Sequence, residues 1–397
     1  MAREPIRVAN FSGYFGDRRT AVDEAMAGDR FDVLVGDYLA EITLAALSAP
    51  HQRDPRRGYV DYFVEQVRPH LTAIADRGIK IVTNAGGFHP AGLAAALRDE
   101  ITAAGVALRV AHVEGDNILA DLPRLQQQGH RFDNLDGGAP LRDWAATPFA
   151  ANAYLGGWGV AAALAAGADI VVCGRVTDAS LTVGPAAWWH GWHTDDWHAL
   201  AGAVVAGHII ECGPHAVGGN FSGFLDIPHR TIPGFPIAEI AADGSCVITK
   251  HGRDGGAVTP DTVTAQIMYE IQGPLYLNPD VSVRLDDLRV SHAGPDRVAV
   301  SGAEGAPPPP TTKVAIFGPI GFTVVNTVFV TSPHVEEKIA LIRDQLAVGL
   351  SDEVTLDLTP IGTAADDPES QWAATVALRV MATAATAETL AGMWLAR

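Results

Sequence analysis

The first half of the chain repeats one pattern: a short apolar run, a polar or glycine-containing turn, and then a stretch with helical character. Strands that alternate with helices are typical of βαβ units, whose strands lie parallel in a sheet covered by helices on both faces. We therefore expect an α/β fold in which the apolar runs are parallel neighbours in one doubly covered sheet. These runs are Ile6–Phe11, Phe31–Val35, Ile79–Thr83, Leu108–Val113 and Asp169–Cys173.

The pattern changes after about Trp188, where a segment rich in tryptophan and histidine is followed by a glycine-rich loop. Beyond Asp261 the apolar runs indicate antiparallel strands mixed with helices. We predict two domains. Residues 1–255 form the α/β domain that carries the strand-end loops, and residues 256–397 form a smaller α+β domain that covers the substrate or mediates oligomerisation.

The charge balance limits the partners of the chain. Its 46 acidic residues outnumber 28 basic ones, for a net charge of −18. This excess argues against nucleic acid and anionic membrane surfaces as partners, since both favour a basic face. The sequence has neither the apolar stretch of a signal peptide nor a window long enough to span a membrane. Three cysteines predict no disulfide framework. We expect a cytoplasmic protein that forms a homo-oligomer.

Polar side chains follow several of the predicted strands, and ligands of parallel sheets bind at the carboxyl ends of the strands. Asp37 and Asp178 are candidates for acid/base chemistry, although Asp37, or Thr177 beside Asp178, would equally cap a helix. Arg175 beside Gly174 suits a carboxylate or phosphate. The turn from Asn84 to Gly87 offers amides to an oxyanion, and a plain tight turn explains its glycines equally well.

Two clusters combine residues that transfer protons or bind metals. His112, Glu114 and Asp116 alternate, so on a strand they would share one face and form an acid/base or divalent-metal cluster. Alternatively, Glu114 and Asp116 lie past the strand end and His112 is a core residue. His208, Glu211 and Cys212 would share one helix face, where they bind a metal or activate the thiol.

No nucleotide cofactor is expected, because the first predicted turn has one glycine fewer than the dinucleotide-binding fingerprint and no phosphate-binding lysine motif occurs. The sequence therefore predicts no cofactor, with a bound divalent metal ion as the alternative. The paired-cysteine spacing of structural zinc sites is also absent from the sequence.

Several ordered blocks of the sequence resemble the acyclic terpene utilisation AtuA family. They include Gly36–Glu41, Ile81–Gly87, Ala111–Asp116, Ala151–Gly156, Gly174–Ser180 and Gly207–Gly213, and together they span nearly the whole chain. The resemblance implies a role in the bacterial breakdown of terpenoid alcohols such as citronellol and geraniol, which proceeds through acyl-CoA intermediates. Cys173 stands where the family usually has threonine, which argues against it as an essential nucleophile. The sequence of Val314–Pro319 also differs from the usual sequence of the family at this place.

The sequence thus predicts an enzyme that performs acid/base chemistry on a small acyl compound, either a CoA thioester or a carboxylate with an apolar tail. Hydratase, dehydratase or lyase chemistry fits best. The alternatives are a hydrolase that uses Cys212 or a metal-bound water, and a non-catalytic partner of an acyl-CoA-processing assembly. The candidate catalytic residues are Asp37, Glu114, Asp116, Asp178, His208, Glu211 and Cys212. The candidate substrate-binding residues are Ser12, Gly13, Tyr38, Asn84, Gly86, Gly87, Arg175, Thr177, Gly219 and Asn220.

Overall fold

The computed structural model describes residues 3–271 and 273–395, and the chain divides into two compact units. Unit 1 comprises the chain up to Gly138 together with Pro148–Phe317, and unit 2 comprises Ala139–Thr147 together with the chain from Gly318 onward. The predicted division at residue 255 falls inside unit 1, because strands on both sides of that residue belong to one large sheet.

The five predicted strands are parallel neighbours, which confirms the central expectation from the sequence. Every adjacent pair among them is parallel, and Val33 of one strand lies beside both Val8 and Lys80 of its neighbours. Their order in the sheet is β1 (Ile6–Ser12), β2 (Val33–Gly36), β3 (Lys80–Thr83), β6 (Ile170–Cys173) and β4 (Val110–Val113). The carboxyl ends of these strands therefore meet at one edge of the sheet.

Beyond β1 the sheet continues with antiparallel strands, so it is mixed. The added strands, in order away from β1, are β7 (Pro236–Ile240), β8 (Cys246–Lys250), β12 (Arg297–Ser301) and β11 (Arg289–Gly294). Each pairs antiparallel with its neighbour, beginning with Ala9 of β1 beside Ile237 of β7. Two of these strands lie past residue 255, and they tie the predicted second domain into the first sheet.

Alternate residues of the central strands enter two different hydrophobic clusters. On β1, Ile6 and Val8 belong to one cluster, which contains residues of the long helices α8 (Ser180–His190) and α9 (Trp197–Glu211). Ala9 and Phe11 belong to the other, which contains residues of α3 (Tyr62–Val67) and α5 (Pro90–Ala104). This follows from the two-residue period of a strand. Full burial of a side chain such as Phe11 contributes roughly 1.5–3 kcal/mol.

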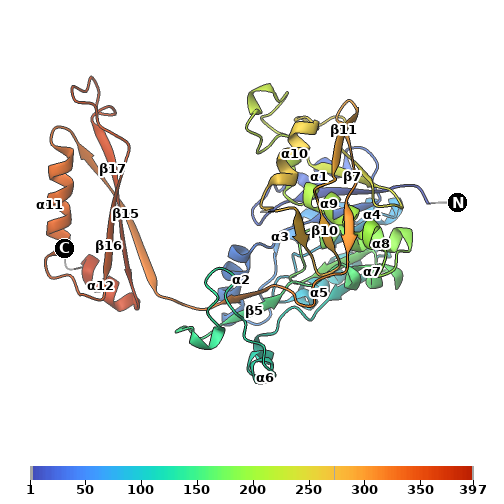
Figure 1. The fold of residues 1–397 in the computed structure, drawn as a ribbon, viewed down its shortest axis with the longest axis horizontal. Coiled ribbons are helices and arrows are strands. Elements are labelled where there is room, and N and C mark those ends of the chain that lie inside the picture. The colour runs from blue at the N-terminus through green and yellow to red at the C-terminus, as the bar shows by residue number, and fades with distance from the viewer. Residues whose placement is uncertain (1–2, 272, 396–397) are drawn as a thin grey trace. The chain divides into compact units, whose positions relative to one another are not determined.

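Two small sheets complete unit 1 (Figure 1). One pairs β5 (Ala150–Ala153) with β14 (Val314–Phe317), and the other has the order β13 (Glu304–Ala306), β10 (Ser282–Arg284), β9 (Leu275–Leu277). The remaining helices of unit 1 are α1 (Ala21–Met26), α2 (Glu41–Arg53), α4 (Leu71–Arg77), α6 (Leu122–Gln127), α7 (Trp158–Ala165) and α10 (Pro260–Met268).

Unit 2 contains an antiparallel sheet with two helices. The strand order is β15 (Phe322–Thr331), β17 (Thr375–Ala384), β16 (Thr355–Ile361), and the helices are α11 (Val335–Ala347) and α12 (Ala387–Leu395). Ile339 of α11 packs in one cluster with Val330, Leu378 and Val380. In both units, none of the helices in the described part of the chain is long and apolar enough to cross a membrane.

Candidate active site at the carboxyl edge of the sheet

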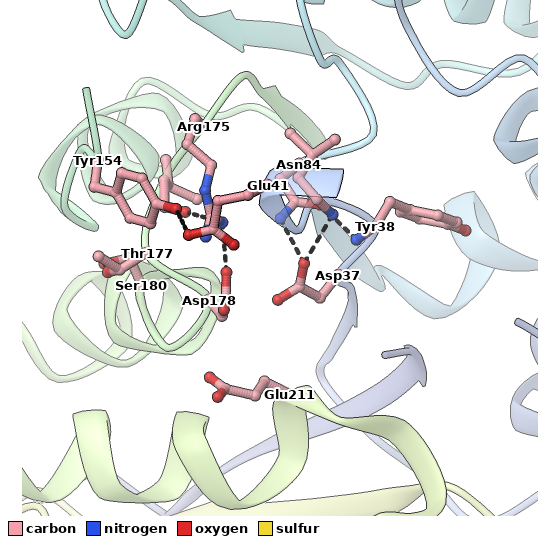
Figure 2. Close-up of polar contacts among 12 residues, drawn as sticks. Asp37, Tyr38, Glu41, Asn84, Tyr154, Arg175, Thr177, Asp178, Ser180 and Glu211 are labelled. Atoms are coloured by element: carbon pink, nitrogen blue, oxygen red, sulfur yellow. Dashed lines mark hydrogen bonds and ion pairs between the residues drawn. The ribbon is translucent and has the colours of Figure 1, made fainter. Parts of the chain in front are cut away.

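Asp37 directly follows β2, and its neighbours at two other strand ends hold it in place. Its backbone N–H donates to the carbonyl of Ser12 at 2.9 Å, and the Ser12 hydroxyl donates to its carbonyl at 2.9 Å. The fully buried Asn84 donates from Nδ2 to Asp37 Oδ1 at 2.6 Å and accepts the Tyr38 N–H at 2.7 Å (Figure 2). Because the Tyr38 N–H can only donate, it fixes which end of the Asn84 amide faces Asp37.

Arg175 follows β6 and is almost fully buried. Its Nη1 donates to Asp178 and to the carbonyl of Val176, and its guanidinium lies 4.1 Å from the centre of the Tyr154 ring. Its Nε has no hydrogen-bond partner among the described residues. A guanidinium between a carboxylate and an aromatic face is held in one orientation, and its remaining donors suit an anionic ligand.

Asp116 fixes the backbone from which Arg175 projects. Its carboxylate accepts the Arg175 N–H at 2.8 Å and the Nδ2 of Asn152 at 2.8 Å. Gly174 allows this approach, because a Cβ there would lie 2.5 Å from an Asp116 oxygen. Asp116 therefore supports the strand end, in contrast to the predicted catalytic role, and burial raises the pKa of its carboxyl.

His208 and Glu211 form a buried pair on α9. His208 Nδ1 lies 3.1 Å from Glu211 Oε1, while His208 Nε2 and Glu211 Oε2 have no hydrogen-bond partner in the described part of the chain. Burial raises the pKa of Glu211 to about 7, against the opposing effect of His208, and the charge of Asp178 adds to the rise. Burial acts to lower the pKa of His208, but its interactions with Glu211, together with those with Gln266 and Glu270, outweigh this effect and raise the pKa.

Two buried carboxyl groups at this edge, Asp37 and Glu211, are both affected by the charge of a third, Asp178. Burial raises the pKa of Asp37 well above its usual range, and the negative charges of Asp178 and Glu211 act in the same direction. Arg175 and Asn84 oppose the rise. Figure 2 shows Asp37 and Asp178, which lie just after β2 and just before α8, with Glu211 on the helix below them. Close carboxyl groups cannot all be ionised at little cost, so these charges favour the protonated forms of Asp37 and Glu211.

A cavity of about 670 Å³ opens beside this cluster within unit 1. Its polar wall includes Arg175, Thr177, Asp178, His208 and Glu270, and its apolar wall includes Tyr276, Leu277 and Pro279. At another part of the wall, Glu41 accepts hydrogen bonds from the Tyr154 hydroxyl and, at 2.7 Å, from Lys313 Nζ. Despite partial burial, these two bonds lower the pKa of Glu41 to about 2. The volume is typical of a small-molecule site.

Seven of the predicted residues thus gather at one edge of the sheet. Four of them line the cavity. Of the other three, Asp37 and Glu211 interact electrostatically with cavity residues, and Asn84 holds Asp37 through a hydrogen bond. The seven are Asp37, Asn84, Arg175, Thr177, Asp178, His208 and Glu211.

The glycine turn after β3 does not offer free amides to an oxyanion. The Gly86 N–H donates to the Cys173 carbonyl at 3.1 Å, and the Gly87 N–H donates to the Asn84 carbonyl at 3.2 Å. A Cβ at Gly86 would lie 2.5 Å from the Cys173 oxygen, so close backbone packing explains this glycine. The predicted substrate-binding residue Tyr38 does not line the cavity, and its hydroxyl donates to Gln66 at 2.8 Å.

The predicted cluster of His112, Glu114 and Asp116 does not form, and Glu114 does not line the cavity. β4 is the edge strand of the sheet and ends at Val113, so His112 and Glu114 are exposed, with 3.4 Å between His112 Nε2 and Glu114 Oε1. Gly115 then turns the chain with φ +114°, and Asp116 points inward. Within the described residues, no group of three or more His, Cys, Asp or Glu side chains is arranged to hold a metal ion.

The remaining predicted residues have other surroundings. Burial raises the pKa of the Cys212 thiol, and the charge of Glu211 adds to this rise, so the thiol stays protonated at neutral pH. The Gly13 N–H donates to Asp17 at 2.9 Å, and its Cα packs against the Cys212–Gly213 peptide. Gly219 and Asn220 line a different hollow of about 450 Å³.

Sequence reasoning assigned no role to Glu41, Tyr154 or Lys313 in the cavity wall. Tyr154 lies in the Ala151–Gly156 block, which carried part of the family resemblance, and this was the available signal. Lys313 reaches Glu41 because β14 pairs with β5 and places it next to Tyr154, whose N–H donates to the Lys313 carbonyl at 2.9 Å. No local sequence pattern encodes that long-range pairing.

Comparison with known proteins identifies one family. The sequence matches the model of a family described as "Acyclic terpene utilisation family protein AtuA" over residues 6–396. Neither a curated protein nor a solved structure matches the chain.

Proposed function

The chain belongs to the acyclic terpene utilisation AtuA family, and we propose on this premise that it is an enzyme of acid/base chemistry on a small acyl compound. The substrate is a CoA thioester or a carboxylate with an apolar tail, and the reaction is a hydration, a dehydration or a related lyase step. The observation that carries this proposal is the cavity wall in which Arg175, Asp178 and His208 stand together, with Asp37 and Glu211 behind them.

The reaction class needs one group that removes a proton and one that donates a proton. In a dehydration, a base takes a proton from the carbon next to the acyl carbonyl, and an acid gives a proton to the departing hydroxyl, which leaves as water. Asp178 and His208 face the cavity as these two groups. Glu211, whose pKa is about 7, exchanges a proton with His208 through their hydrogen bond. A proton donor and acceptor near neutral pH are what general acid/base catalysis requires.

The charge and shape of the cavity favour an acyl ligand. Negative charge develops on the carbonyl oxygen when the adjacent carbon loses a proton, and the buried guanidinium of Arg175 is the cation placed to stabilise it. The ring of Tyr276 and the side chains of Leu277 and Pro279 offer an apolar surface to the tail. These features support an acyl compound over a purely polar substrate.

The two alternative functions have less support. A cysteine hydrolase needs a thiolate, and burial of Cys212 beside Glu211 favours the protonated thiol. For a metal-bound water, the predicted ligands His112, Glu114 and Asp116 do not converge. A non-catalytic partner protein would have no need for a buried carboxyl, imidazole and guanidinium cluster at a cavity, because such groups cost folding free energy.

A substrate screen tests the proposal. The protein is incubated with matched sets of α,β-unsaturated and 3-hydroxy acyl compounds, each as the CoA thioester and as the free acid, with straight and branched tails. Mass spectrometry then detects the gain or loss of water or a cleavage product. We expect turnover in at least one set and a loss of about 10²–10⁴-fold in Asp178→Asn and His208→Gln.

The matched control is Glu114→Gln, which removes the same charge from an exposed position outside the cavity. We expect it to keep the activity of the parent. Equal loss in Glu114→Gln and Asp178→Asn, or full activity in both cavity variants, contradicts the assignment of the site.

A further inference from the structure

The sheet of unit 2 ends in a long strand with one unpaired side. All ten residues of β15 pair with β17 from Phe322 to Thr331, and no strand among the described residues lies along the other side of β15. An edge strand presents a row of backbone donors and acceptors to which another strand can pair.

β15 lacks the features by which edge strands usually avoid such pairing. Its sequence, FTVVNTVFVT, contains no charged residue, proline or glycine, and its register with β17 shows no bulge. The opposite edge strand, β16, is protected in two ways, because it carries the charged Asp357 and because Pro360 has no backbone N–H. The two edges of one sheet therefore differ, and β15 is the edge that admits a partner.

On the face of the sheet away from the helices, β15 exposes apolar side chains, which also favours a partner strand at this edge. Val324 and Val330 point toward the helices and pack in their clusters. The residues between them alternate to the other face, where Val325 is 57% and Phe329 is 71% exposed. Their partners on β17 in that face are Met381 and Ala377. Exposed apolar side chains beside an unpaired edge would be buried if the sheet continued.

We propose that the partner is β15 of a second copy of the chain, paired antiparallel about a two-fold axis centred on Thr327. In this register Val325 of each copy faces Phe329 of the other, twice by symmetry. Such aromatic and β-branched cross-strand pairs are among the stabilising ones. The pairing joins the two sheets of unit 2 into one continuous sheet with the helices of both copies on the same face.

The charge of the chain supports a second copy as the occupant. With a net charge of −18, two copies repel each other at most surfaces. β15 is an uncharged stretch, so self-pairing brings no like charges together across the strand pair. Two-fold, self-complementary contacts are also the usual way in which identical chains associate.

Charge substitutions at the facing pair test both the partner and the register. We measure the mass of the full-length protein in solution by light scattering or sedimentation equilibrium. The parent is expected at twice the chain mass. V325K/F329K places lysine opposite lysine in both pairs and should give the single-chain mass. V325K/F329E places lysine opposite glutamate in both pairs and should restore twice the chain mass.

Thr355→Lys is the control, because it adds a lysine to the opposite edge strand of the same sheet and should leave the parent mass unchanged. Thermal unfolding verifies that each variant is folded. A parent of single-chain mass, a V325K/F329K variant that keeps twice that mass, or a V325K/F329E variant that fails to regain it would each overturn the proposal.

Discussion

Glu211 carries an unusual combination of features for a carboxyl group. It lies in the last turn of α9, buried, with one oxygen beside His208 and the other unpaired among the described residues. The pKa of this carboxyl is therefore raised to about 7, so both its protonated and its ionised form are populated near neutral pH. At the scale of single residues, the site depends on such groups, whose pKa values are set by burial and by neighbouring charges.

The pH dependence of stability follows from this residue. The folded pKa of Glu211 is raised from 4.5 to about 7, so between those values the unfolded chain loses its proton while the folded chain keeps it. Stability therefore falls as pH rises through this range, by about 3 kcal/mol from this group.

We expect the free energy of unfolding, measured with urea, to be lower at pH 8 than at pH 5.5 for the parent. Glu211→Gln cannot ionise, so its loss between these pH values should be smaller. The buffers should be matched in ionic strength, and Glu114→Gln, which changes an exposed carboxyl, should follow the parent. If Glu211→Gln and the parent lose the same free energy, Glu211 is not the buried neutral acid described above.

At the scale of elements, the predictable part of the fold is local. Each of the five parallel strands is an apolar run followed by a turn and a helix, and that order alone requires a shared edge for Asp37, Asn84 and Arg175. The sequence indicated antiparallel strands beyond Asp261 but not that such strands extend this sheet, because β7 pairs with β1 across more than half of the length of unit 1. Glu114 was misplaced because sequence alternation does not reveal that β4 is an edge strand.

The turn after β3 packs closely against the end of β6. Gly86 is required by contact between backbones, because a Cβ there would lie 2.5 Å from the Cys173 carbonyl and 2.9 Å from Pro90. Gly86→Ala should therefore lower the free energy of unfolding by roughly 1–3 kcal/mol, as is typical for overpacking. Gly137→Ala is the control, since its Cβ would meet only the Asn134 side chain at 3.4 Å. An equal effect of both substitutions in urea unfolding would show that the turn is not tightly packed.

At the scale of the whole molecule, the chain combines a sheet edge that carries the candidate active site, in unit 1, with a small sheet in unit 2. The sequence predicted a mixed second domain but placed its start near residue 255, because apolar runs do not reveal which sheet a strand joins. β11 and β12 extend the large sheet, and unit 2 begins its main segment only at Gly318. The proposed pairing of β15 assigns the oligomeric contact to unit 2 and leaves the cavity in unit 1 complete within one chain.

In the proposed reaction, the cavity groups move a proton to and from the carbon next to an acyl carbonyl. Deuterium exchange measures this step directly. An acyl compound that binds is incubated with the protein in heavy water, and mass spectrometry follows deuterium at that carbon. We predict incorporation by the parent and a rate about 10²–10⁴-fold lower in Asp178→Asn and in His208→Gln. Incorporation by both variants at the parent rate would show that Asp178 and His208 do not transfer the proton. No incorporation by the parent into any bound acyl compound would show that the protein does not remove this proton.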